Sequence, residues 1–260
     1  TISGGTLQIS SSGSLGSGSY AGNISNAGAL QYSSSATQTL SGVISGAGTL
    51  TKDTSTSVLT LSGANTYTGL TTVSAGTLAL SGTSYNGGTF NVDSGATLRL
   101  DANNVFGNDG SSPTTTFNIS GTLASNSTYT KLNTLNLTGA TLACNGGQDA
   151  YWGCFGLAGN VTTSGTSQVT TNAASNSRVF LGNAVTSTAA TTFNVTDTFT
   201  VGAPLANNAS LANSALTKTG SGTMALTAVN TYTGATTISG GTLQISGTGS
   251  LGSGSYGGAI

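Results

Sequence analysis

The sequence is almost without charge. It has no His and no Glu, and only 4% of its residues are charged, against roughly 25% in an ordinary soluble domain. Five Lys and Arg balance six acids, all Asp, for a net charge of −1. Without basic clusters, nothing predicts a nucleic-acid partner or a membrane-surface patch. The absence of His also removes the commonest general base of enzymes.

Long apolar runs and helix-forming residues are scarce as well. No stretch of about 18 apolar residues exists, so we expect no membrane insertion of this chain. Glu, Lys, Arg and Met are few or absent, which disfavours helices. The 40 Gly and many Ser and Asn favour turns, while Thr, Val, Ile, Tyr and Phe favour strands. With 36% apolar residues to form a core, the composition predicts an all-β protein.

The beginning of the sequence recurs at its end. Residues 1–24 read TISGGTLQISSSGSLGSGSYAGNI, and residues 237–260 repeat them with four differences. A shared fold does not demand such identity, so duplication is the simpler cause. We therefore expect residues 1–260 to be a single continuous segment, about one 236-residue period (237 − 1) of a tandem array.

A second repeat lies inside this period. Residues 59–80 and 224–245 share the motif Asn-Thr-Tyr-Thr-Gly, and a matching Leu-Thr-Lys precedes each copy, ending at Lys52 and Lys218. We expect each motif Tyr to cover a corner with a solvated hydroxyl, and each Lys to keep a surface soluble. The motif residues singled out are Asn65, Tyr67, Gly69, Asn230, Tyr232 and Gly234.

Short alternating segments predict how the chain folds. Leu59-Thr60-Leu61 alternates apolar and polar residues, as strands do, and Leu recurs 19 residues later at Leu78. Strands this short, separated by Gly and Asn, predict a right-handed parallel β-solenoid (β-helix) with coils of roughly 19 to 28 residues. Residues 101–116, 143–158 and 202–214 are predicted to be loop excursions.

Two segments also resemble a known family. Residues 41–80 and 215–245 are similar to the passenger-associated transport repeat of autotransporter-type surface proteins, through Thr-Leu-Thr-Lys (Ala-Leu-Thr-Lys in the second segment), Asn-Thr-Tyr-Thr-Gly and Gly-Thr-Leu. The resemblance implies a secreted β-helical passenger, located extracellularly or at a bacterial cell surface. In that family the repeat is tied to export and folding rather than to catalysis.

The loop at residues 143–158 carries the two cysteines. Cys144 and Cys154 would form a disulfide in an exported chain, the alternative being two free, partly buried thiols. Tyr151 and Trp152 between them could contact a sugar ring or another protein, but packing of the loop onto the solenoid is the preferred interpretation.

Other polar clusters give weaker signals. Asp101, Asn103 and Asp109, with Asn104 and Asp93 nearby, are a conceivable calcium site, although their spacing matches no EF-hand and favours Asx turns. Asp101 and Asp109 are also the best pair of carboxylates for glycan hydrolysis, but six scattered acids are little material. We expect no enzyme, no cofactor and no resident metal.

The sequence thus predicts a structural rod or stalk segment of an extracellular fibre or giant surface protein. Its partners would be further copies of the unit, in tandem or end to end. The alternative is an adhesin module that binds glycan or a host surface through residues 101–116 and 143–158.

Overall fold

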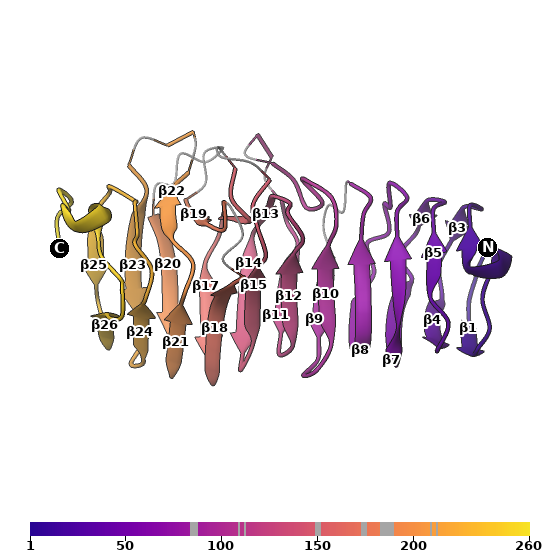
Figure 1. The fold of residues 1–260 in the computed structure, drawn as a ribbon. Coiled ribbons are helices and arrows are strands. Elements are labelled where there is room, and N and C mark those ends of the chain that lie inside the picture. The colour runs from indigo at the N-terminus through magenta and orange to yellow at the C-terminus, as the bar shows by residue number, and fades with distance from the viewer. Residues whose placement is uncertain are drawn as a thin grey trace.

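The protein is an elongated β-solenoid. The computed structural model describes residues 1–83, 88–108, 110–111, 113–148, 152–172, 176–182, 190–208, 210–211 and 213–260. Strands follow one another along one axis, and the two termini lie at opposite ends of the row (Figure 1). The strand pairings of the described part are parallel, so the predicted fold class, a parallel β-solenoid, is confirmed.

Each full coil passes three faces, which we number in chain order. Face 1 is the most irregular and holds β3 (Ile24–Ser25), β6 (Ile44–Ser45), β13 (Thr130–Leu132), β16 (Phe155–Leu157), β19 (Val179–Leu181) and β22 (Leu205–Asn207). Face 2 holds β1 (Thr6–Ser11), β4 (Ala29–Ser34), the first parts of β7 (Thr49–Leu61) and β8 (Thr71–Leu80), β9 (Thr89–Val92), β11 (Thr116–Ile119), β14 (Thr134–Thr138), β17 (Val161–Ser164), β20 (Ala190–Val195), β23 (Ala215–Thr219) and β25 (Thr236–Ile238).

Face 3 completes the coil. It holds β2 (Ser19–Tyr20), β5 (Gln38–Leu40), the last parts of β7 and β8, β10 (Thr97–Leu100), β12 (Thr122–Ser125), β15 (Thr141–Cys144), β18 (Thr166–Thr171), β21 (Thr198–Val201), β24 (Thr223–Leu226) and β26 (Thr242–Ile245). The helices in the described part are two 3₁₀ turns, η1 (Gly16–Gly18) and η2 (Gly252–Gly254). Neither is long and apolar enough to cross a membrane.

Corners between faces need residues that adopt left-handed backbone angles. β8 crosses from face 2 to face 3 at Gly76, whose φ is +71°. A Cβ atom there would lie 2.3 Å from the carbonyl oxygen of Thr54 in the preceding coil. The many glycines of the sequence therefore serve both to turn the chain and to let coils stack closely.

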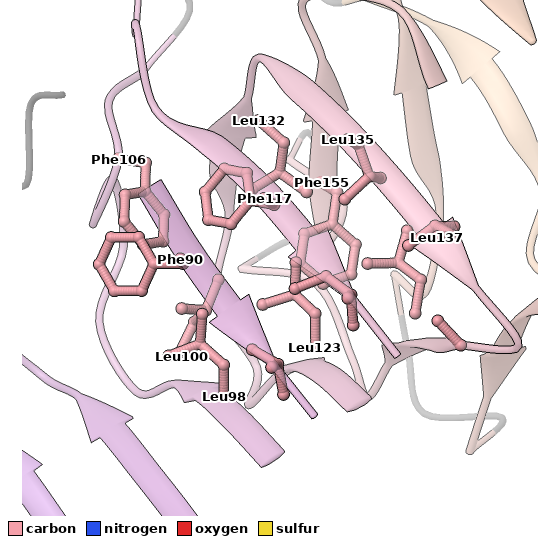
Figure 2. Packing of buried hydrophobic residues seen from close by; sticks show 14 of the residues in the cluster. Phe90, Leu98, Leu100, Phe106, Phe117, Leu123, Leu132, Leu135, Leu137 and Phe155 are labelled. Carbon is pink, nitrogen blue, oxygen red and sulfur yellow. The ribbon is translucent and has the colours of Figure 1, made fainter. Parts of the chain in front are cut away.

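The core consists of apolar side chains stacked from coil to coil. On face 3 the inward positions pair in the order Leu59, Leu78, Leu98, Leu123, Leu142, Val169, Val201, Leu226 and Ile245. Figure 2 shows Phe90 and Phe117 of face 2 and Phe106 of face 1 meeting in the interior, where the Phe90 and Phe117 rings stack at 5.9 Å. Each fully buried Leu stabilises the fold by about 1.5–3 kcal/mol.

Coil length varies along the rod. The shortest coil takes 18 residues, from Thr116 to Thr134, and the longest takes 32, from Val161 to Phe193. This range is slightly wider than the predicted 19 to 28. The coils of 25 or more residues all lie between β9 and β23, in the middle of the rod, and their described excess length lies in the connections from face 3 to face 2. Excursions of the chain are therefore concentrated on face 1.

Candidate functional site

The motif asparagines join neighbouring coils on face 1. The Asn65 side-chain oxygen accepts a hydrogen bond from the backbone N–H of Ile44 at 2.7 Å, and its amide nitrogen donates to Gly63 at 2.9 Å. Asn230 accepts from the backbone N–H of Leu205 at 3.0 Å and donates to Ala228 at 2.7 Å. Both side chains are buried, and their hydrogen bonds satisfy buried backbone groups that strand pairing leaves without a partner at this corner.

The motif tyrosines are buried with their hydroxyl groups. Tyr67 and Tyr232 form hydrogen bonds of 2.8 Å with the hydroxyls of Thr71 and Thr236, four residues further along the chain. The prediction that these hydroxyls stay solvated is therefore wrong. Burial raises the pKa of Tyr232 to about 12 and raises the pKa of Tyr67 further.

The last motif position has room only for glycine. A Cβ atom on Gly69 would lie 2.1 Å from the carbonyl oxygen of Gly48, and one on Gly234 would lie 2.5 Å from that of Ser214. Both contacts involve backbone of the preceding coil, which cannot move aside cheaply. The motif Asn-Thr-Tyr-Thr-Gly thus forms and stabilises the tight corner between faces 1 and 2.

The two repeat lysines lie inside the solenoid, contrary to the prediction that they keep a surface soluble. Lys52 and Lys218 are fully buried. Lys218 Nζ donates to the carbonyl oxygens of Thr219, Gly220 and Gly240 at 2.7, 2.9 and 3.1 Å. Lys52 Nζ donates to Thr54 and, at 3.2 Å, to Ala75. Burial lowers the pKa of both lysines, and Asp53 partly offsets this at Lys52.

The loop at residues 143–158 is held by a disulfide. The Cys144 and Cys154 sulfur atoms are bonded at 2.01 Å, and their Cα atoms are 5.5 Å apart. Trp152 is half-buried, and its ring lies 4.9 Å from that of Tyr129 and 6.5 Å from that of Phe180. It therefore packs onto neighbouring coils of face 1. Tyr151 lies outside the described residues.

A cavity of about 320 Å³ adjoins this aromatic cluster. The described residues that line it include Asn104, Asn108, Tyr129, Gln148, Trp152 and Ser210. These side chains offer amide and hydroxyl groups and one partly exposed aromatic ring, but no charge. The described part of this lining can exchange hydrogen bonds with a polar ligand.

The calcium candidates make other contacts. Asp101 binds Arg99 through an ion pair of 2.7 Å and accepts a hydrogen bond from Asn126 at 3.0 Å. Burial would raise the pKa of Asp101, but these hydrogen bonds outweigh it and hold the pKa below its usual value. Asn103 accepts from the backbone N–H of Tyr129 at 3.0 Å. Asp109 lies outside the described residues, and among those described no three Asp, Glu, His or Cys side chains cluster.

Comparison with known proteins bears on the repeats. The family model of the passenger-associated transport repeat matches residues 54–80 and 216–245. These two segments are passenger-associated transport repeats. Each matched segment contains one complete Asn-Thr-Tyr-Thr-Gly corner and the strand that follows it. The repeats and the β-solenoid together fit an autotransporter passenger, and the repeat implies a secreted or surface-exposed protein. Searches of curated proteins and of solved structures found no match.

The burial of the two repeat lysines has a signal in the sequence that the prediction of a surface role overlooks. Lys52 stands two residues after Leu50, and Lys218 two residues after Leu216, so alternation places each Lys on the same inward side as its Leu. The cavity, by contrast, has no signal in the sequence. The cavity brings together Asn104, Gln148 and Ser210, which are distant in sequence and meet only because the coils stack.

Proposed function

We propose that this segment is a non-catalytic spacer, a rod that holds other parts of an extracellular or surface protein away from the cell. The observation that carries this proposal is the inward ladder of face 3, which continues from Leu59 to Ile245 without a joint. A continuous ladder makes the rod stiff along its length, because each coil is hydrogen-bonded to both neighbours. The disulfide and the transport repeats support an extracellular location.

Adhesion of cells that display the chain tests the spacer function. Trp152→Ala removes the partly exposed ring beside the cavity, and Thr162→Ala is a matched control on the exposed side of face 2. For a spacer, both variants keep wild-type adhesion and rod length by electron microscopy. Shortening the rod by whole coils, by contrast, reduces the reach of whatever it carries.

A second candidate function is glycan binding at the cavity beside Trp152. The uncharged amide and hydroxyl lining and the partly exposed indole favour it, since sugars stack on aromatic rings and bond to amides. A glycan array separates the two functions. Binding of a neutral oligosaccharide by the parent and the Thr162→Ala variant, but not by Trp152→Ala, would replace the spacer with the binding module.

A further inference from the structure

The duplicated end segments form the same coil. The residues Ser17 and Ser253 both have left-handed backbones, with φ/ψ of 54°/37° and 53°/31°. Gly18 and Gly254 have φ of 93° and 92°. In each copy one strand, β1 or β26, is followed by one 3₁₀ turn, η1 or η2. Near-identical sequence therefore gives near-identical backbone at the two ends of the rod.

The two copies differ in what covers them. In the first copy, Ile2 and Ile9 are each 7% exposed, because residues 25–48 form the next coil and pack on them. Their equivalents Ile238 and Ile245 are 45% and 41% exposed. These two Ile positions are thus buried at one end and open at the other, whereas Leu7 is 38% exposed in the first copy and Leu243 is half-buried in the second. The open side of coil 237–260 has the shape and chemistry that residues 25–48 cover in coil 1–24.

The opposite side of this coil is also seen packed, at the C-terminal end. There the Tyr256 hydroxyl forms a hydrogen bond of 2.7 Å with Thr236, and its ring lies 5.9 Å from that of Tyr232. Its equivalent, Tyr20, lies in coil 1–24, whose packed side faces residues 25–48. The structure therefore shows both sides of the repeated coil in contact with their neighbours, one side at each end.

The differences between the copies fit this arrangement. Ser11 adopts φ of 59°, and its counterpart Gly247 adopts 62°, an angle that glycine tolerates better. Asn23 accepts a hydrogen bond from the backbone N–H of Val43 in the next coil, and Ala259 at the same place lacks that one acceptor. The open side thus keeps the strand edge and loses only this side-chain contact.

The two copies do not lie on the same faces. Ile2 lies on face 1 and Ile238 on face 2, while β1 lies on face 2 and β26 on face 3. Counting along the pairings, three turns lead from β1 through β4 and β7 to β8, and seven lead from the end of β8 through β10, β12, β15, β18, β21 and β24 to β26. Between them the chain advances by one face within β8. One period therefore spans ten turns and one face.

We propose that the open side of coil 237–260 is covered by residues 25–48 of a second copy of this unit, in the register of β1 with β4. Each successive unit then sits one face further around the rod. The partner strand aligns Thr242 with the second copy's Ala29 and Ile245 with its Tyr32, as Thr6 and Ile9 align in this chain. Face 1 of the next unit, which carries its loop excursions, is therefore in line with face 2 of this unit. After three units the excursions lie on the original side of the rod again.

A chain of three units tests the rotation. Residues 1–260 are followed directly by two further copies of 25–260, and the product is imaged by electron cryomicroscopy. We expect one uninterrupted solenoid in which the loop-bearing side moves by one face at each unit. Loops aligned along a single side, or rods separated by a flexible joint, would overturn the proposal.

Hydrogen exchange tests the covered face in a chain of two units. The amides of Leu243 and Ile245 at the junction should exchange roughly tenfold or more slowly than in the 260-residue chain, since they face the open side and gain acceptors from the new strand. The amides of Thr242 and Ser246 already donate to the preceding coil and should change less. Residues 223–226, which already have a coil on each side, are the internal control and should not change. Equal exchange at the junction in the two chains would contradict the proposed register.

A local substitution gives a second reading. Ile245→Ala in the first unit of the two-unit chain should lower the free energy of unfolding clearly more than the same substitution does in the 260-residue chain, because this side chain is covered at the junction and 41% exposed at the free end. Equal shifts would count against burial at the junction. The rotated array rests on the proposed spacer function, but its tests do not use adhesion. If the junction tests contradict the rotated array, the proposed spacer function is unaffected. If the adhesion test contradicts the spacer function, the junction can still be measured by hydrogen exchange and unfolding.

Discussion

One buried lysine belongs to each copy of the repeated sequence, Lys52 just before the first transport repeat and Lys218 within the second, and each donates hydrogen bonds to the backbone of a corner. Lys218 reaches carbonyl groups of its own coil and of the following coil, so one side chain ties two coils together. Burying an ammonium group costs free energy, and hydrogen bonds to carbonyl dipoles offset only part of that cost. The lysine is therefore kept for fixing the corner rather than for maximal stability.

Replacing this lysine tests its role. Lys218→Ala should destabilise the fold by about 2–4 kcal/mol, because it leaves a cavity and carbonyl groups without donors. Lys218→Met should cost less, since it fills the space and removes the buried charge. The measurement is equilibrium unfolding in urea. Thr237→Ala, at an exposed position of β25, is the control and should change stability by no more than about 0.5 kcal/mol. A cost for Lys218→Ala as small as that of the control would contradict the role.

The buried tyrosines predict a loss of stability at alkaline pH. The pKa of Tyr232 is about 12 in the folded state and 10.0 in the unfolded state. Below pH 10 both states keep the proton, so the stabilisation is fully present. Between pH 10 and 12 the unfolded state releases its proton first, and stability falls as the pH rises. The lysines act in the opposite direction, since their lowered pKa makes stability rise as the pH approaches 10.5.

A single variant isolates the tyrosine contribution. Tyr232→Phe cannot ionise, so the difference in unfolding free energy between parent and variant should shrink by up to about 2–3 kcal/mol between pH 10 and 12. Urea unfolding at several pH values measures this difference, and absorbance at 295 nm follows tyrosinate formation. A difference that stays constant over this range would show that Tyr232 does not resist ionisation in the fold.

At the scale of elements, the strands were predictable and the corners were not. Alternation in Leu59-Thr60-Leu61 marks the inward side of a strand, and the structure places both Leu residues in the core. The corner motif is recognisable as a repeat, but the prediction of a solvated hydroxyl for its tyrosine is wrong. That error has a physical source, since the partner of the hydroxyl, Thr71 or Thr236, is ambiguous until the corner geometry is known.

Because the coils stack closely at the corner, adding one methyl group to Gly69 should cause a large loss of stability. Gly69→Ala should destabilise the fold by more than about 2 kcal/mol and lower the melting temperature accordingly, because the new Cβ meets the backbone of the preceding coil. Gly4→Ala is the matched control, since a Cβ added there would meet no atom within 4 Å beyond its chain neighbours, and the φ of Gly4 is not left-handed. Thermal unfolding followed by circular dichroism measures both. Equal melting temperatures for the two variants would mean that the coils are not as close as the structure shows.

At the scale of the whole molecule, stacking explains the unusual composition. Equivalent positions of neighbouring coils lie about 4.8 Å apart, so a repeated charge would meet its like in each coil. Uncharged side chains instead bond along the rod, as Asn91, Asn118 and Asn136 do through amide contacts of 2.9 and 2.8 Å. The solenoid could thus be predicted from composition and repeats together. The cavity could not, because its walls come from loops of different coils.

The direction of the hydrogen bonds has a mechanical consequence. Strands run across the rod, so the bonds between coils point along its long axis. Tension between the two ends therefore opens one ring of bonds after another instead of shearing many at once. A coil of about 20 residues contributes about 4.8 Å when stacked and roughly 65–70 Å when drawn out. A rod built to resist bending thus holds a large reserve of extension that a sustained pull would release coil by coil.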